Sequence, residues 1–126
     1  MKEVINTSLA PSPIGPYNQA VRAGNMLFVS GQIAIIPETG TLVEGDIHAE
    51  TTQVMANIEA ILKASGFGFS DVVKTSIFLS DMGLFVEVNT IYATYFDENA
   101  PARETIAAKE LPKNVNVEIS VIAYKA

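Results

Sequence analysis

The clearest alternation of apolar and polar residues in the chain is Val115-Asn116-Val117-Glu118-Ile119-Ser120-Val121-Ile122-Ala123-Tyr124, near the C-terminus. A pattern of period two predicts a β-strand whose side chains point alternately to two faces of a sheet. Val115, Val117, Ile119, Val121 and Ala123 form the apolar face, and Asn116, Glu118, Ser120 and Ile122 form the other. The chain outside this stretch is therefore expected to supply further strands and the helices that cover the apolar face.

Five other segments have the composition of strands. They cover residues 4–5, 17–22, 26–30, 72–79 and 104–110. The turn Ala23-Gly24-Asn25 separates the second segment from the third, which predicts a hairpin. Within residues 72–79 the alternation predicts one face made of Val73, Thr75, Ile77 and Leu79 and another made of Lys74, Ser76 and Phe78.

Two segments have the pattern of amphipathic helices. Apolar residues recur at helical spacing from Asp46, which suits an N-cap, to Gly66, which suits the position just after a helix. The second predicted helix follows Asp81 and is ended by Ala100-Pro101. Its apolar stripe consists of Phe85, Val88, Tyr92, Tyr95 and Phe96.

The order of these elements predicts an α+β fold, with a mixed six-stranded sheet and two helices on one face. The length of 126 residues fits one domain, residues 1–126. Charged residues make up 17% of the chain, against a typical value of about 25%. So little charge favours a homo-oligomer, with the mixed apolar and polar second face of the sheet as the subunit interface.

Composition also disfavours several classes of function. The net charge of −6 disfavours nucleic acid as a partner, because such binding depends on Lys and Arg. The chain has no cysteine, which excludes disulfides, thiolate nucleophiles and zinc–thiolate sites, and its single histidine, His48, cannot build a multi-histidine metal site. The sequence shows no signal-peptide pattern and no apolar run near the ~20 residues of a membrane span. A cytoplasmic protein without metal or cofactor is the expectation.

The residues with the strongest chemical promise are Arg103 and Glu118. Arginine offers a planar fork of donors that matches a carboxylate, and glutamate can hold or deprotonate a water molecule. The alternatives are a surface salt bridge for Arg103 and a solvent-facing or purely structural position for Glu118. Whether the two side chains meet depends on strand register, since a slip of one residue reverses the face of every side chain.

Further candidates carry weaker signals. Tyr17 follows a rigid, proline-rich segment, residues 10–16, and lies in a pocket, in the core or at an interface. Asn89 falls on the apolar stripe of the second helix, where a buried amide needs a partner. Ser30 and Thr105 have no histidine partner in the sequence, so a serine-type triad is disfavoured.

Four blocks of the sequence together resemble the RidA (YjgF/YER057c) family of reactive-intermediate deaminases, which act on imines and enamines. The blocks are residues 14–21 (Ile-Gly-Pro-Tyr-Asn-Gln-Ala-Val), 27–33 (Leu-Phe-Val-Ser-Gly-Gln-Ile), 72–89 and 101–119, and they span nearly the whole chain in order. The resemblance implies a chorismate-mutase-like subunit and a homotrimer with a central barrel and clefts between subunits. It also implies hydrolysis of 2-imino acids, such as 2-iminobutanoate and 2-iminopropanoate, to 2-oxo acids and ammonia without a cofactor.

The resemblance further implies roles for individual residues. Arg103 would bind the substrate carboxylate and Glu118 would position the attacking water. The Gly31 backbone and the Thr105 side chain would orient the ligand, and Tyr17, Ser30 and Asn89 would line the cleft. Three positions, Asn18, Ala34 and Thr105, depart from common family residues, which bears on substrate preference more than on reaction type.

Two other functions compete with the deaminase. One is a trimer of the same fold that binds or senses small acids without much catalysis. The other is a ribonuclease or translation inhibitor, an older description of the family, which the acidic composition and the single histidine disfavour.

Overall fold

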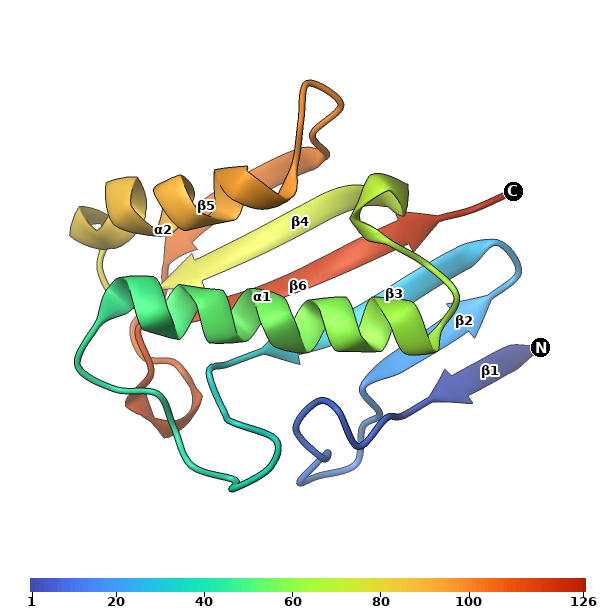
Figure 1. The fold of residues 1–126 in the computed structure, drawn as a ribbon, viewed down its shortest axis with the longest axis horizontal. Helices are drawn as coiled ribbons and strands as arrows, with labels where there is room; N and C mark the ends of the chain where they lie inside the picture. The colour runs from blue at the N-terminus through green and yellow to red at the C-terminus, as the bar shows by residue number, and fades with distance from the viewer.

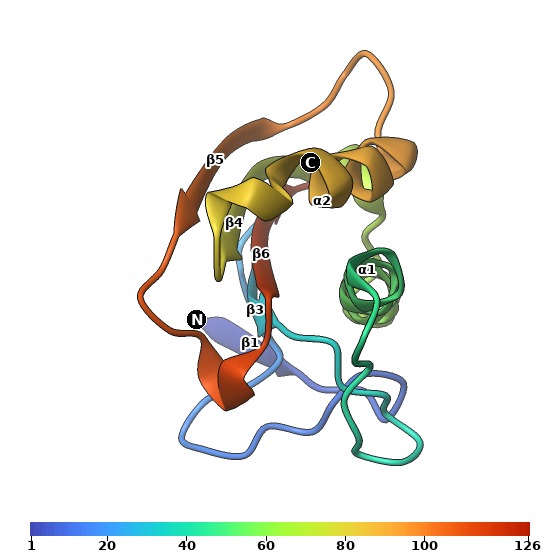
Figure 2. The same cartoon turned by 90° about the vertical axis from the view of Figure 1, so that its left-hand side faces the viewer.

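The computed structural model describes all residues, 1–126, and contains six strands and two α-helices. These elements follow one another along the chain in the order predicted from the sequence. Their bounds are β1 (Lys2–Ile5), β2 (Ala20–Ala23), β3 (Met26–Gln32), α1 (Ile47–Ala64), β4 (Val72–Leu79), α2 (Phe85–Tyr92), β5 (Ala102–Ala107) and β6 (Val117–Tyr124). The mixed α+β architecture with both helices on one face is therefore confirmed (Figures 1 and 2).

The strands form one sheet in the order β1-β2-β3-β6-β4-β5. Only β4 and β5 run parallel, and every other neighbouring pair is antiparallel. The C-terminal strand β6 lies in the middle of the sheet, between β3 and β4, as its strict alternation requires. Strand β5 lies at one edge of the sheet, behind α2 in the view of Figure 1.

The hydrophobic core lies between the sheet and the helices. Helix α1 packs along β6 and β3, and α2 packs on α1 above β4 and β5 (Figure 1). The apolar face of β6, from Val117 to Ala123, is fully buried there. It meets the stripe of α1 formed by Val54, Met55, Ile58, Ile61 and Leu62.

Helix α1 begins and ends as the sequence predicts. The Asp46 side chain accepts a hydrogen bond from the His48 backbone N–H at 3.0 Å, which satisfies one of the free donors of the first turn. After the helix, Gly66 takes φ of +80°, a conformation that glycine adopts at little cost. No helix of the structure is long and apolar enough to cross a bilayer.

Three local predictions are wrong. A bulge in β4 between Val72 and Lys74 places Val72, not Val73, on the buried face, and Val73 is exposed. The second predicted helix is divided into α2 and two flanking 3₁₀ turns, 82–84 and 93–95. Residues 17–19 lie outside any strand because their backbone and side-chain groups bond to residues of the N-terminal loop instead.

Candidate functional site

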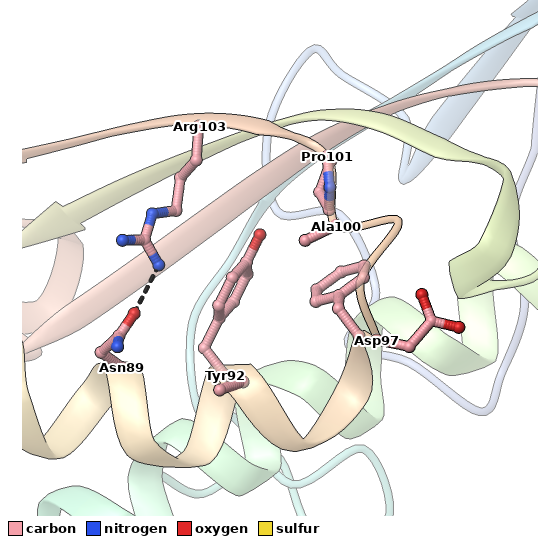
Figure 3. Close-up of a pocket in the computed structure, with 8 residues that line it drawn as sticks. Asn89, Tyr92, Asp97, Ala100, Pro101 and Arg103 are labelled. Carbon is pink, nitrogen blue, oxygen red and sulfur yellow. Dashed lines mark hydrogen bonds between the residues drawn. The ribbon is translucent and has the colours of Figure 1, made fainter.

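Arg103 lies on edge strand β5 and points toward α2. Its Nη1 donates a hydrogen bond to Asn89 Oδ1 at 2.6 Å (Figure 3). The guanidinium carbon also lies 5.4 Å from the ring centroid of Phe85 and 5.1 Å from that of Tyr92. A guanidinium carries five N–H donors, so this arrangement leaves most of the fork free.

Arg103 makes no ion pair, so the surface salt bridge considered for it is absent. The only ion pair in the structure joins Lys74 and Glu104 at 3.2 Å, on the other face of the sheet. A hydrogen bond from Ser76 and the interaction with Lys74 lower the pKa of Glu104. The Glu104 carboxylate thus interacts with Lys74 and Ser76, and the positive charge of Arg103 remains available to a ligand.

The free side of Arg103 opens onto a cavity of about 460 Å³ between α2 and the start of β5. Figure 3 shows Tyr92 projecting from α2 toward β5 beside Arg103, with Pro101 on its other side. Its lining is Asn89, Tyr92, Ala93, Phe96, Asp97, Ala100, Pro101 and Arg103. A cationic fork at the rim of a partly apolar cavity suits a small carboxylic acid.

Glu118 lies at the start of β6, on the sheet face that the helices do not cover. Burial of its carboxyl raises its pKa above that of an ordinary glutamate. The side chain lies over Gly31, where an added Cβ would come within 2.9 Å of the Glu118 carboxyl carbon. The absence of a side chain at Gly31 therefore makes room for the Glu118 carboxyl.

A second cavity of about 110 Å³ surrounds Glu118. Tyr17 reaches it from the N-terminal loop, and Lys113 reaches it from the turn before β6, where it takes φ of +55°. The lining also includes the apolar side chains of Ile14, Ile33 and Ile35 and the polar ones of Ser12, Gln19 and Gln32. A carboxylate in such a partly desolvated pocket is a stronger base than one in water.

Gln19, a buried residue that does not stand out in the sequence, lines the same cavity as Tyr17 and anchors the N-terminal loop. The Gln19 side-chain amide donates to the carbonyls of Thr7, Ala10 and Pro11, at 3.0, 3.2 and 2.8 Å, and its Oε1 accepts from the Thr7 N–H. These bonds fold the proline-rich loop back onto the sheet. In the sequence, the only sign of this role is that the polar Gln19 stands beside apolar residues at the start of a strand.

Ser30 and Thr105 have different environments. The Ser30 hydroxyl donates to the Asn18 carbonyl at 2.6 Å, which joins β3 to the segment carrying Tyr17. Thr105 lies two residues after Arg103 on the same face of β5, with its hydroxyl buried and without a hydrogen-bond partner. Thr105 thus lies on the same face as Arg103, whereas Ser30 is joined to the segment that carries Tyr17.

The predicted site residues therefore form two separate groups. Across the sheet, Arg103 pairs with Thr75, which in turn pairs with Val121 on the helix-covered face. Glu118 pairs with Phe78, three residues further along β4, on the opposite face. Within one subunit Arg103 and Glu118 therefore do not meet, which answers the question of strand register that the sequence left open.

The chain matches the family model described as Endoribonuclease L-PSP over residues 7–125. The chain belongs to the RidA (YjgF) family. A RutC family protein of Pyrococcus horikoshii is 54% identical over 125 residues, covering 99% of this chain and 99% of that protein.

Of two further members of the RidA family, one is named for a reaction and one is known with a bound ligand. The chloroplastic Reactive Intermediate Deaminase A of Arabidopsis thaliana is 48% identical over 97% of this chain and 65% of its own length. The crystal structure of Escherichia coli TdcF with bound serine has a TM-score of 0.92 and 37% identity, covering 98% of this chain and 99% of that one. The family resemblance inferred from the sequence is confirmed.

Proposed function

We propose that this RidA family member is a deaminase that hydrolyses 2-imino acids, with 2-iminobutanoate and 2-iminopropanoate as the substrates to test first. The observation that carries the proposal is the unpaired Arg103 guanidinium, held by Asn89 at the rim of a cavity. The name of the Arabidopsis relative supports the reaction, and the serine bound to TdcF supports a small acid as ligand.

In this reaction Arg103 binds the substrate carboxylate through its free N–H groups. A hydrogen bond to a charged group contributes roughly 1.5–3 kcal/mol, enough to orient a small acid. Asn89 holds one edge of the guanidinium, which leaves the other edge for the ligand. The Thr105 hydroxyl, buried without a partner two residues away, is a further donor on the same face.

Glu118 acts on the water. Its carboxylate takes a proton from the water as the oxygen attacks the electrophilic imine carbon, and the protonated Glu118 then returns this proton to the nitrogen. The resulting carbinolamine transfers its hydroxyl proton to the nitrogen as the C–N bond breaks, which releases ammonia and leaves the 2-oxo acid. The raised pKa of Glu118 brings the base closer to neutrality, where proton transfer is most effective. Tyr17 and the Gly31 backbone border the same cavity and orient the ligand there.

The two groups act on one molecule only if two copies of the chain supply them. The sheet face that carries Glu118 also exposes large apolar side chains: Val4, Phe28, Ile106 and Tyr124 are 45–51% exposed. A second copy of the chain is the partner that we infer for this face. Exposed apolar side chains mark interaction surfaces, and Glu118 with its cavity lies at the same surface. A homotrimer with sheets facing inward would bring Arg103 of one subunit to Glu118 of the next.

The test is the release of ammonia from 2-iminobutanoate and 2-iminopropanoate, generated in situ, by the wild type and Arg103→Ala side by side. Acceleration by the wild type alone supports both the reaction and the role of Arg103. Equal rates for the two proteins, both faster than buffer, would contradict the role of Arg103. No acceleration together with binding of 2-oxo acids would favour the alternative, a ligand-binding protein of the same fold.

A further inference from the structure

Three residues on one face of α2 contact Arg103. Phe85, Asn89 and Tyr92 are spaced four and three residues apart, which places them on a single stripe of the helix. All three contact the guanidinium, Asn89 through its amide and the two aromatic residues through their rings. The apolar stripe of α2, predicted as part of the core, therefore also contacts the Arg103 guanidinium.

We propose that Tyr92 is a positioning residue for Arg103: its buried ring fixes the guanidinium so that the free edge of the fork faces the cavity. This inference rests on the proposed role of Arg103 in carboxylate binding. The contact is the face of the ring, 5.1 Å from its centroid to the guanidinium carbon, and not the phenol hydroxyl.

The Tyr92 ring can do this because it is itself immobilised. Only 5% of Tyr92 is exposed. Its ring packs against Phe96 with centroids 4.9 Å apart, and Phe96 packs edge-on against Phe69 at 5.5 Å. The aromatic cluster anchors the ring in the core, whereas Arg103 extends from an edge strand and is largely exposed.

An aromatic support differs chemically from a carboxylate support. A ring face attracts the cation without accepting any of its N–H donors, so the fork and the positive charge remain available to a ligand. An Asp or Glu in the same place would occupy the fork and neutralise the charge. Fixing the long Arg103 side chain in advance also reduces the rotamer freedom lost on binding.

The Tyr92 hydroxyl has a separate environment. Its oxygen is buried near the Thr75 hydroxyl, and the two oxygens do not meet in the geometry of a regular hydrogen bond. Burial raises the pKa of the Tyr92 phenol, against the lowering effects of Thr75 and of the Arg103 charge, so the group stays neutral at physiological pH. Removing the hydroxyl alone should therefore leave Arg103 in place.

The experiment compares Tyr92→Leu, which removes the ring, with Tyr92→Phe, which keeps it. Tyr95→Leu is the matched control, because Tyr95 packs on Phe69 in the same cluster and makes no contact with Arg103. Calorimetry would measure the affinity of each variant for 2-oxobutanoate and for its neutral analogue 2-oxobutanamide, with thermal unfolding as the test of folding. If Tyr92→Leu does not fold, Tyr92→Met takes its place.

Tyr92→Leu is expected to bind 2-oxobutanoate about fivefold more weakly, the scale of a partly desolvated cation–π contact, with unchanged affinity for 2-oxobutanamide. Tyr92→Phe and Tyr95→Leu should bind both ligands like the wild type. Wild-type affinity in Tyr92→Leu, an equal loss in Tyr95→Leu, or a loss in Tyr92→Phe would overturn the role of the ring.

Ammonia release by the wild type is measured in parallel and reports on the proposed function alone. A wild type that binds 2-oxobutanoate through Arg103 but releases no ammonia overturns the deaminase and leaves the role of Tyr92 standing. A wild type that binds no carboxylate overturns both.

Discussion

Arg103 and Glu118 lie on opposite faces of the same sheet, three residue rows apart. Arg103 faces the helices and opens onto the larger cavity, and Glu118 faces away from them and lies in the smaller one. One small substrate cannot touch both side chains within a subunit, because the sheet itself lies between them. The separation is the physical basis for the proposal that the site is shared between two copies of the chain.

Arg103→Ala should lower kcat/KM for 2-iminobutanoate by at least about tenfold, since it removes a hydrogen-bonded charge. Arg103→Lys should restore little, because an ammonium cannot supply the planar fork. The matched control is Arg22→Ala: Arg22 is the only other arginine, donates to the Gly24 carbonyl and lies over Phe67, away from both cavities. Equal losses in the two alanine variants would point to a general electrostatic effect instead.

Glu118→Gln should lower kcat by about a hundredfold with little change in affinity for the 2-oxo acid, if Glu118 acts as the base. Only the ionised carboxylate accepts a proton, so kcat of the wild type should rise as pH increases through the pKa of Glu118 and then level off. Burial raises that pKa, which moves the rising limb to higher pH than for an ordinary glutamate. A pH–rate profile measures this rise. If kcat of Glu118→Gln rises with pH over the same range as that of the wild type, the titrating group is not Glu118.

Gly31→Ala should impair catalysis through Glu118. The added methyl group would press on the carboxyl of Glu118, whose Cδ lies 2.9 Å from the Cβ position, and displace the base. We expect kcat to fall about 10- to 100-fold, the scale of a small misplacement of a catalytic group. Gly68→Ala is the control, since nothing lies within 4 Å of its Cβ position. Wild-type turnover in Gly31→Ala would show that Glu118 need not stay where it lies.

Glu50 should matter for stability. This residue of α1 is 3% exposed, and its carboxylate accepts hydrogen bonds from the N–H groups of Asn116 and Val117, at 2.8 and 3.2 Å, where β6 begins. Glu50→Ala leaves these donors without a partner and should lower the free energy of unfolding by about 2 kcal/mol or more. Glu59→Ala, on the more exposed side of the same helix, should cost less than about 0.5 kcal/mol. Denaturant unfolding compares them, and equal costs would contradict the role given to Glu50.

The fold was largely predictable because its strongest signals are local. The alternation of β6 and the capped, periodic α1 determine their own structure, and both appear where the sequence predicts them. The bulge at Val73 was not predictable, since one extra residue in β4 depends on how β6 pairs with it. The division of the second helix into α2 and two 3₁₀ turns was missed because its apolar stripe continues through all three pieces.

The site was predictable as a set of residues and not as a geometry. Arg103 and Glu118 stand out by residue type, but the face on which each lies depends on the pairing of β5 and β6 with β4. Tyr92 was read as a core residue, which it is, and its contact with Arg103 follows only from the packing of α2 over β5. Gln19 and Glu50 were missed because their partners are backbone groups distant in the sequence.

The most direct test of the shared site is to unfold two impaired variants, Arg103→Ala and Glu118→Gln, to refold them together, and to measure ammonia release from 2-iminobutanoate. If each site takes Arg103 from one copy and Glu118 from its neighbour, random assembly from equal amounts makes about a quarter of the sites complete. We predict that activity returns to about a quarter of that of the wild type refolded in the same way. Activity no higher than that of the separately refolded variants would contradict a site built from two copies.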